Sequence, residues 1–302
     1  GYALGIHPQK AGALLIGTQD NGTTLVQPDS EARILDGDGF HAFFDPDQEG
    51  RLYASAYYGL LYRSDDGGRT MTNIANYLQT NGPNEVGAWQ TPFQLHPAVP
   101  GRIVAAKKSV HFSDDGGDHW TSWGGIGNTK ATAMALSNQD AQAALIAKNS
   151  ELFWRDSSTM NFHDVPGMPG SYIGDVAIDA EDSGTWWMAF GDYVEGRQVW
   201  RTNNYGSTWQ NVSSGLPTLP IHVLKQLADG NWVCGSDLGV HIWDEENMSW
   251  SNYGQGLPLT PAVDLTEDLM LNRLLVSTYG RGLWSCPLPT TPSMAGTMTN
   301  VT

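Results

Sequence analysis

Several carboxylic acids stand in stretches that we expect to be loops between strands: Asp20, Asp36, Asp38, Glu85, Asp192 and Asp237. Glycoside hydrolysis needs two carboxyl groups that face one cleft, ~6.5–9.5 Å apart in an inverting enzyme. Asp20 and Asp38 are the pair that we would assign as acid and base in a hydrolase. The alternative is that both side chains cap turns in glycine-rich loops, since short acidic side chains accept hydrogen bonds from nearby backbone N–H groups.

Aromatic and polar side chains from the same expected loops form a candidate ligand-binding face. Aromatic rings stack on sugar rings and anchor protein contacts, and Arg, Tyr and Trp dominate the energetics of interfaces. We therefore expect a protein or glycan partner on this face, although Trp89 and Tyr279 alternatively pack across the tops of the sheets. The predicted residues are Asp20, Asp38, Tyr57, Tyr58, Trp89, Gln90, Lys107, Tyr193, Asp237, Tyr279 and Arg281, with Lys108 beside them.

The charge and composition of the 302-residue chain exclude several classes of protein. Its 32 acidic and 16 basic side chains give a formal net charge of −16, so a nucleic-acid duplex or an anionic membrane would repel it. No apolar run approaches the ~20 residues that a membrane-spanning helix needs. The two cysteines, Cys234 and Cys286, stand in apolar runs and are predicted to be buried thiols. They are too few for a zinc site, and we predict no metal and no cofactor.

A turn sequence recurs along the chain with the pattern Ser/Thr-x-Asp/Asn-x-Gly-x-x-Trp/Met. Its three full copies begin at Ser64, Ser113 and Thr202, and shortened versions occupy residues 156–162 and 244–250. Three stretches of strand-like sequence precede most copies and a short one follows them, which predicts a four-stranded antiparallel unit. The first strands of such units begin near Ala3, Ala42, Phe93, Ala133, Val176, His222 and Val263.

Seven starts at a spacing of roughly 41 residues are typical of propeller blades. We predict an all-β, seven-bladed β-propeller of four-stranded antiparallel blades over residues 1–288, with a six-bladed ring as the alternative. The last unit is expected to end after its third strand, so that one blade is completed from both termini, which removes free edges. Residues 289–302, rich in Pro, Ser and Thr, are predicted to be a linker or tail.

The recurring turn is predicted to be structural rather than catalytic. Its last glycine takes a positive φ, its Asp or Asn accepts backbone N–H groups, and its Trp or Met covers the outer edge of the blade. The Asp-x-Asp-x-Asp-Gly spacing of a calcium loop is absent, so no metal is expected there. The residues assigned to this role are Ser64, Asp66, Gly68, Ser113, Asp115, Gly117, Trp120, Thr202, Asn204, Gly206 and Trp209, together with Met71.

These turns resemble the Asp-boxes, or BNR repeats, of sialidases, xyloglucan hydrolases and sortilin/Vps10-type receptors. Residues 17–23, 37–40, 88–93 and 277–284 resemble bacterial exported or cell-surface proteins with Vps10-like propellers. The resemblance covers nearly the whole chain to Leu288. It implies an extracellular or cell-surface location and fusion to further domains of the same polypeptide.

Three functions follow from this resemblance. The favoured one is a non-catalytic module that serves adhesion, assembly or the binding of a protein or glycan. The alternative is a polysaccharide hydrolase, although the catalytic signatures of xyloglucanases are not recognisable here. The third is a peptide-binding receptor like sortilin, which has ten blades and a cysteine-rich module that this chain lacks. A sialidase is disfavoured because no Arg-Ile-Pro segment occurs and the ten arginines stand mostly at repeat positions.

Overall fold

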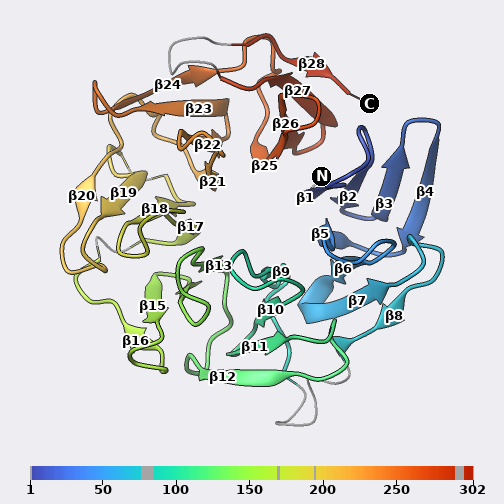
Figure 1. The fold of residues 1–302 in the computed structure, drawn as a ribbon. Helices are drawn as coiled ribbons and strands as arrows, with labels where there is room; N and C mark the ends of the chain where they lie inside the picture. The colour runs from blue at the N-terminus through green and yellow to red at the C-terminus, as the bar shows by residue number, and fades with distance from the viewer. Residues whose placement is uncertain (1, 76–84, 169–170, 194, 290–295, 302) are drawn as a thin grey trace. The chain divides into compact units, whose positions relative to one another are not determined.

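The computed structural model describes residues 2–75, 85–168, 171–193, 195–289 and 296–301. They form seven four-stranded antiparallel sheets, each built from four consecutive strands, and the fold is a seven-bladed β-propeller (Figure 1). The predicted fold class is thereby confirmed, and the six-bladed alternative is wrong. A single 3₁₀ turn, η1 (Tyr57–Gly59), is the one helical element among the described residues, and no described helix is long and apolar enough to cross a bilayer.

The described chain divides into two compact units. The N-terminal unit comprises Tyr2–Lys148 and Phe153–His163, and the C-terminal unit comprises Asn149–Leu152 and Asp164–Thr302. The boundary falls within the fourth sheet. The strands of the first four sheets are β1 (Ala3–Ile6), β2 (Leu14–Thr18), β3 (Gly22–Gln27), β4 (Ser30–Leu35); β5 (Gly39–Phe44), β6 (Leu52–Ala56), β7 (Leu60–Ser64), β8 (Thr72–Asn73); β9 (Phe93–Leu95), β10 (Ile103–Ala106), β11 (Ser109–Ser113), β12 (Thr121–Gly125); β13 (Ala133–Leu136), β14 (Ala144–Lys148), β15 (Glu151–Arg155) and β16 (His163–Asp164).

The remaining three sheets belong to the C-terminal unit. In each of the seven sheets the first strand begins within three residues of the predicted start, because apolar runs bounded by turn residues mark strands well. The strands of these three sheets are β17 (Ile173–Ile178), β18 (Trp186–Phe190), β19 (Val199–Thr202), β20 (Gln210–Asn211); β21 (Ile221–Gln226), β22 (Trp232–Ser236), β23 (Gly239–Asp244), β24 (Ser249–Tyr253); β25 (Ala262–Asp268), β26 (Arg273–Thr278), β27 (Leu283–Pro287) and β28 (Thr299–Asn300).

The three full copies of the recurring turn connect the third strand of a sheet to its fourth, as predicted, and share one set of hydrogen bonds. In the copy at 113–120, Ser113 Oγ donates to Asp115 Oδ1 (2.8 Å) and accepts the backbone N–H of Gly117 (2.8 Å). Asp115 Oδ1 also accepts the N–H of His119 (2.9 Å). Equivalent bonds form in the other two copies, and the last glycine of each has a positive φ of 87°, 98° or 77°. The turn is therefore closed by its own side chains.

The aromatic residue at the end of two of these turns ties neighbouring sheets together. Trp120 is buried, and its Nε1 donates to the carbonyl of Ile74, which follows β8 of the preceding sheet (3.2 Å). Trp250, in a shortened copy, makes the same kind of bond to the carbonyl of Val212 (2.7 Å). These contacts support a structural role for the turn.

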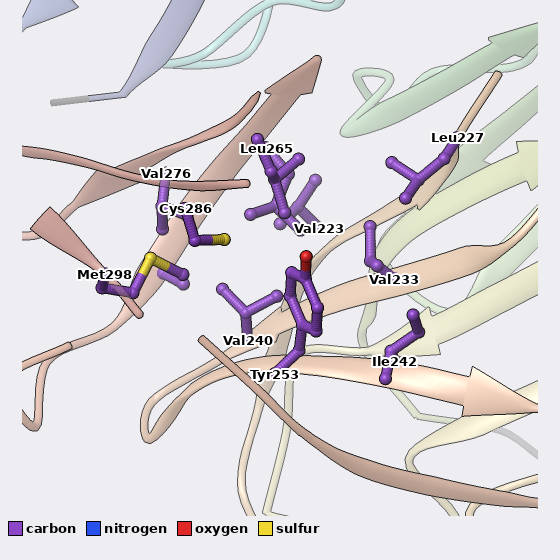
Figure 2. Packing of buried hydrophobic residues seen from close by; sticks show 12 residues of the cluster. Val223, Leu227, Val233, Val240, Ile242, Tyr253, Leu265, Val276, Cys286 and Met298 are labelled. Atoms are coloured by element: carbon purple, nitrogen blue, oxygen red, sulfur yellow. The ribbon is translucent and has the colours of Figure 1, made fainter. Parts of the chain in front are cut away.

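The C-terminal segment differs from its prediction as a tail. Residues Thr299–Asn300 form β28, which pairs with Trp284 and Ser285 of β27, so all four strands of the last sheet come from the C-terminal part of the chain. Among the described strands, no sheet combines strands from both ends of the chain, which differs from the blade expected to be completed from both termini. Figure 2 shows Met298 beside Cys286, and Met298 is 4% exposed. This short strand has two polar residues and no periodicity, so nothing in the sequence marked it as a strand.

Each unit has its own apolar clusters between sheets. The cluster in Figure 2 joins β21–β24 to β25–β28 and includes Cys286, whereas Cys234 packs in a second cluster with the tryptophans of β18, β22, β23 and β24. Both cysteines are buried free thiols, as predicted. Burial raises the pKa of both thiols, that of Cys286 to about 11. A neutral thiol in an apolar cluster acts as a small hydrophobic side chain.

Candidate functional site

Antiparallel order assigns every connection of a sheet to one of its two ends. The link from second to third strand and the link to the next sheet share one end, which we call the loop end; the recurring turn lies at the other, the turn end. The predicted ligand-face residues fall in or beside connections at the loop end of their own sheets. Seven of them belong to the N-terminal unit and four to the C-terminal unit.

The clearest cluster at the loop end consists of Tyr57, Tyr58 and Trp89, which we call the aromatic platform. Their exposed fractions are 39%, 48% and 43%. The rings of Tyr57 and Trp89 stack with centroids 5.9 Å apart, and Tyr58 meets the Trp89 ring edge-on at 5.3 Å. Below them the buried ring of Phe40 packs edge-on against Trp89 at 5.8 Å. Three large rings therefore hold one another in place while close to half of each side chain stays in water.

Backbone hydrogen bonds hold the two segments of the platform together. The N–H of Tyr58 donates to the Trp89 carbonyl (3.3 Å), and the N–H of Gly87 donates to the Tyr58 carbonyl (3.0 Å). Tyr58 has a φ of 62°, a left-handed conformation that is uncommon and costly for a bulky residue. Residues in such conformations cluster at functional sites, where the surrounding structure enforces them.

Lys107 lies against this backbone. Gly59 has a φ of 83°, which favours glycine, and a Cβ there would lie 2.6 Å from Cε of Lys107. The Lys107 side chain is buried, and burial lowers its pKa although the nearby Glu85 opposes that change. Glu85 accepts hydrogen bonds from Ser109 Oγ (3.1 Å) and lies 3.2 Å from His111 Nε2. Burial raises the pKa of Glu85. The contacts with Ser109 and His111 and the charge of Lys107 have the larger effect, so the pKa is lowered from its usual value.

Asp20 and Asp38 are joined by a hydrogen bond from the backbone of one to the side chain of the other. Asp38 Oδ1 accepts the backbone N–H of Asp20 at 2.7 Å, and Asp20 has a φ of 61°. The observed bond is the turn-capping one, and it engages one oxygen of the Asp38 carboxylate. The assignment of the two residues as acid and base stays a prediction.

In the C-terminal unit the structure groups Tyr193 with Asp237. Tyr193 Oη donates to Asp237 Oδ2 (3.3 Å), and the other oxygen of Asp237 lies 2.7 Å from Nε2 of His222. Sequence reasoning missed His222 because it stands inside a strand, where a polar residue carries no loop signal. Tyr279 and Arg281 share the exposed link between β26 and β27. Gln90 is half-buried beside Trp89 in the chain.

A cavity at the turn end of β17–β20 and β21–β24 was not predicted. Its volume is about 620 Å³, and it is lined by Asp179, Thr185, Trp187, Arg201, Gly230, Asn231, Trp232, Trp243, Asp244, Glu245, Glu246 and Asn247. Arg201 Nη1 donates to both oxygens of Glu245 (3.0 and 2.8 Å), and its guanidinium lies over the Trp187 ring. The tryptophans were visible only as apolar strand residues, so nothing in the sequence distinguished them from core.

No cluster of three or more His, Cys, Asp or Glu side chains that would suit a metal ion occurs within the described residues. The loop end of the N-terminal unit offers exposed aromatic rings that a ligand could contact.

Comparisons with solved structures agree with the fold. The GH74 xyloglucanase from Xanthomonas campestris matches 98% of this chain at 12% identity with a TM-score of 0.73. YCF48 bound to D1 peptide matches 99% at 12% identity with a TM-score of 0.60, and 87% of that chain is covered. An ancestral GH74 enzyme matches 99% at 16% identity with a TM-score of 0.52. The chain spans about half the length of the two GH74 proteins, 53% and 56%. No protein-family model and no curated protein sequence matches the chain. At these identities the likeness shows the fold alone.

Proposed function

We propose that this chain is a non-catalytic binding module that holds a protein or glycan partner through the aromatic platform. In this proposal it is part of a larger exported or cell-surface protein that serves adhesion or assembly, and its recurring turns are Asp-boxes of the Vps10-like type. The shared hydrogen bonds of the three full turns support the last point.

The observation that carries the proposal is the exposure of three aromatic rings that contact one another across two neighbouring connections. A soluble protein normally leaves large apolar side chains scattered singly on its surface, and contiguous apolar patches mark binding sites. Rings of Tyr and Trp are preferred at such sites because they offer a large contact area with few rotatable bonds. A neighbour of the same fold, YCF48, is described with a bound peptide, which supports a partner-binding role for propellers of this kind.

The hydrolase alternative rests on the fold that the chain shares with two GH74 proteins. It is less favoured because Asp38, one half of the candidate pair, already holds the backbone of Asp20. Turnover of a polysaccharide that disappears in both Asp20→Ala and Asp38→Ala would establish it and overturn the binding-module proposal.

Arrays of glycans and of peptides, probed with the whole chain, test the proposal. The expected result is a ligand class whose binding falls ~10-fold or more in Trp89→Ala, as for a residue at the centre of an interface. The matched control is Tyr205→Ala, which removes an aromatic side chain of 51% exposure at the turn end. Binding that Trp89→Ala leaves unchanged would refute the platform as the contact surface.

A further inference from the structure

Lysines gather beside the aromatic platform in a chain that has few of them. Of the six lysines, Lys107, Lys108, Lys130 and Lys148 lie in or next to the connections at the loop end of β9–β12 and β13–β16. We call these four residues the lysine patch. In a protein of net charge −16, such a concentration is a local reversal of sign.

The backbone brings the patch together. The N–H of Ile126 donates to the Lys108 carbonyl (2.9 Å), and the N–H of Ala131 donates to the Lys107 carbonyl (2.8 Å), so the segment that carries Lys130 lies along residues 107–108. The ammonium of Lys148 donates to the Ile126 carbonyl. Main-chain contacts thus hold the segment of Lys130 against residues 107–108, with Lys107 and Lys148 buried beside them.

The patch meets the platform at one ring. Lys130 Nζ lies over the Tyr58 ring, 5.5 Å from its centroid. Lys108 is exposed, and neither it nor Lys130 forms an ion pair with a carboxylate among the described residues. Residues 76–84, which precede Glu85, include no acidic residue. Glu85, whose charge acts on Lys107, is bonded to Ser109 and lies 3.2 Å from His111 Nε2.

Acidic residues stand beside the Tyr57 ring, and one of them, Asp36, pairs with Arg33 (3.5 Å). A Cβ at Gly37 would lie 3.6 Å from the Tyr57 ring, and this glycine is flanked by Asp36 and Asp38. A ligand that covers the three rings therefore meets positive charge at Tyr58 and negative charge at Tyr57. Complementarity of charge fixes the orientation of a ligand more than its affinity.

We propose that the aromatic platform and the lysine patch together bind an anionic polysaccharide built of hexuronate rings. The flat face of one sugar lies on Trp89 and Tyr57, and a carboxylate of the chain lies beside Lys130 and Lys108. This inference rests on the proposed binding function and adds the chemical class of the ligand.

A carboxylated sugar fits better than an acidic peptide because the backbone at the platform is already paired. The N–H and carbonyl of Tyr58 are both engaged, with Trp89 and Gly87. An extended peptide gains much of its affinity from main-chain hydrogen bonds to an open strand edge. The groups at the platform that can contact a ligand are aromatic rings and ammonium groups. These suit a sugar with apolar C–H faces and a charged substituent.

The test uses purified oligomers of galacturonate, of glucuronate and of mannuronate or guluronate, each beside its methyl ester. The methyl ester keeps the ring and removes the charge. The expected result is that at least one oligomer binds at low salt, that its ester binds several-fold more weakly, and that 0.5 M NaCl lowers the affinity toward that of the ester.

Variants separate the two halves of the site. Trp89→Ala is expected to weaken binding ~10-fold or more. The double variant Lys108→Gln/Lys130→Gln is expected to weaken binding of the acid about fivefold, with no effect on the ester, as for exposed ion pairs. Lys10→Gln is the matched control, because Lys10 is exposed in the link between β1 and β2, at the turn end. Thermal unfolding of each variant confirms that it is folded.

The outcomes distinguish this inference from the function on which it rests. Equal, Trp89-dependent binding of acid and ester would overturn the anionic ligand and keep the binding function. Binding of an oligoglutamate peptide without any uronate would likewise overturn the polysaccharide. No Trp89-dependent binding of any glycan or peptide would refute both.

Discussion

Two clusters of aromatic rings in this protein have similar geometry and opposite surroundings. In the aromatic platform the ring centroids lie 5.3–5.9 Å apart, and each side chain is 39–48% exposed. In the C-terminal unit, Trp187 stacks on Trp232 at 4.7 Å and meets Trp243 and Trp250 edge-on, and all four are at most 5% exposed. We call these four residues the tryptophan cluster.

The difference comes from the elements that carry the rings. The tryptophan cluster stands on β18, β22, β23 and β24, where two sheets face each other and each ring contacts the next sheet. The platform stands on η1 and on the segment that precedes β9, in connections between strands, where each side chain stays 39–48% exposed. Similar ring contacts thus stabilise the fold in one place and leave a surface for a partner in the other.

The largest expected effect is the loss of stability on Trp187→Ala. Trp187 is 1% exposed, so its removal leaves a cavity and is expected to lower the free energy of unfolding by about 3–5 kcal/mol. Urea unfolding followed by circular dichroism measures this. A loss below about 1 kcal/mol would mean that the tryptophan cluster is not core, and the comparison with the platform would fail.

Buried and exposed carboxyl groups also differ in how they change the free energy of unfolding with pH. Asp175, on β17, accepts the N–H of Leu224 on β21 (2.8 Å), and burial raises its pKa to about 7 despite this bond and that of Val176. Between about pH 4 and 7 the folded protein keeps a proton that the unfolded chain has lost. This group therefore lowers stability as pH rises, by up to about 1.4 kcal/mol per pH unit, and adds no further change above pH 7.

Asp175→Asn removes this dependence, because the amide does not titrate. The measurement is the free energy of unfolding at several pH values from 4 to 8 for both proteins. Identical slopes would show that Asp175 is ionised in the fold.

The exposed acids of the turns behave in the opposite way. Backbone and hydroxyl hydrogen bonds from Thr70 lower the pKa of Asp66 to about 2, so its contribution to stability is lost as pH falls from about 4 toward 2.

Trp89→Ala is expected to change stability by less than about 1 kcal/mol, since substitutions of half-exposed side chains have small effects. Measured beside Trp187→Ala under the same conditions, it gives the contrast directly. A loss near that of Trp187→Ala would assign the platform to the core and would weaken the proposed binding role.

The smallest effect is spectroscopic. Among the 12 tryptophans, all within the described residues, Trp89 is the most exposed, at 43%. Acrylamide is therefore expected to quench a small fraction of the fluorescence, and Trp89→Phe is expected to abolish most of that fraction. A ligand bound to the platform is expected to shield Trp89 from acrylamide and so to reduce the quenchable fraction of the fluorescence. An unchanged quenchable fraction in Trp89→Phe would contradict its exposure.

The parts of the fold that could be predicted are those built from near neighbours in the chain. The turn at Ser64 is closed by hydrogen bonds between residues two to four positions apart, so its pattern recurs wherever the residues do. The strand starts followed from apolar runs between turns. The C-terminal strand did not, because β28 has two residues and is defined by its pairing with β27.

The site was predictable as a list of residues but not as an arrangement. Tyr57 and Trp89 were both assigned to the ligand face, yet their contact joins segments separated by more than thirty residues. His222 and the cavity beside Arg201 gave no signal, because strand residues at the ends of a sheet look like core residues in the sequence.

The amino-acid sequence by itself determined the number of blades, the position of the recurring turns and the acidic character of the protein, since each depends on local patterning or on composition. Tertiary structure decided which aromatic rings are buried, which carboxylates are engaged and where the lysines gather. These depend on how connections fold back on sheets, which is set by contacts between residues far apart in the chain.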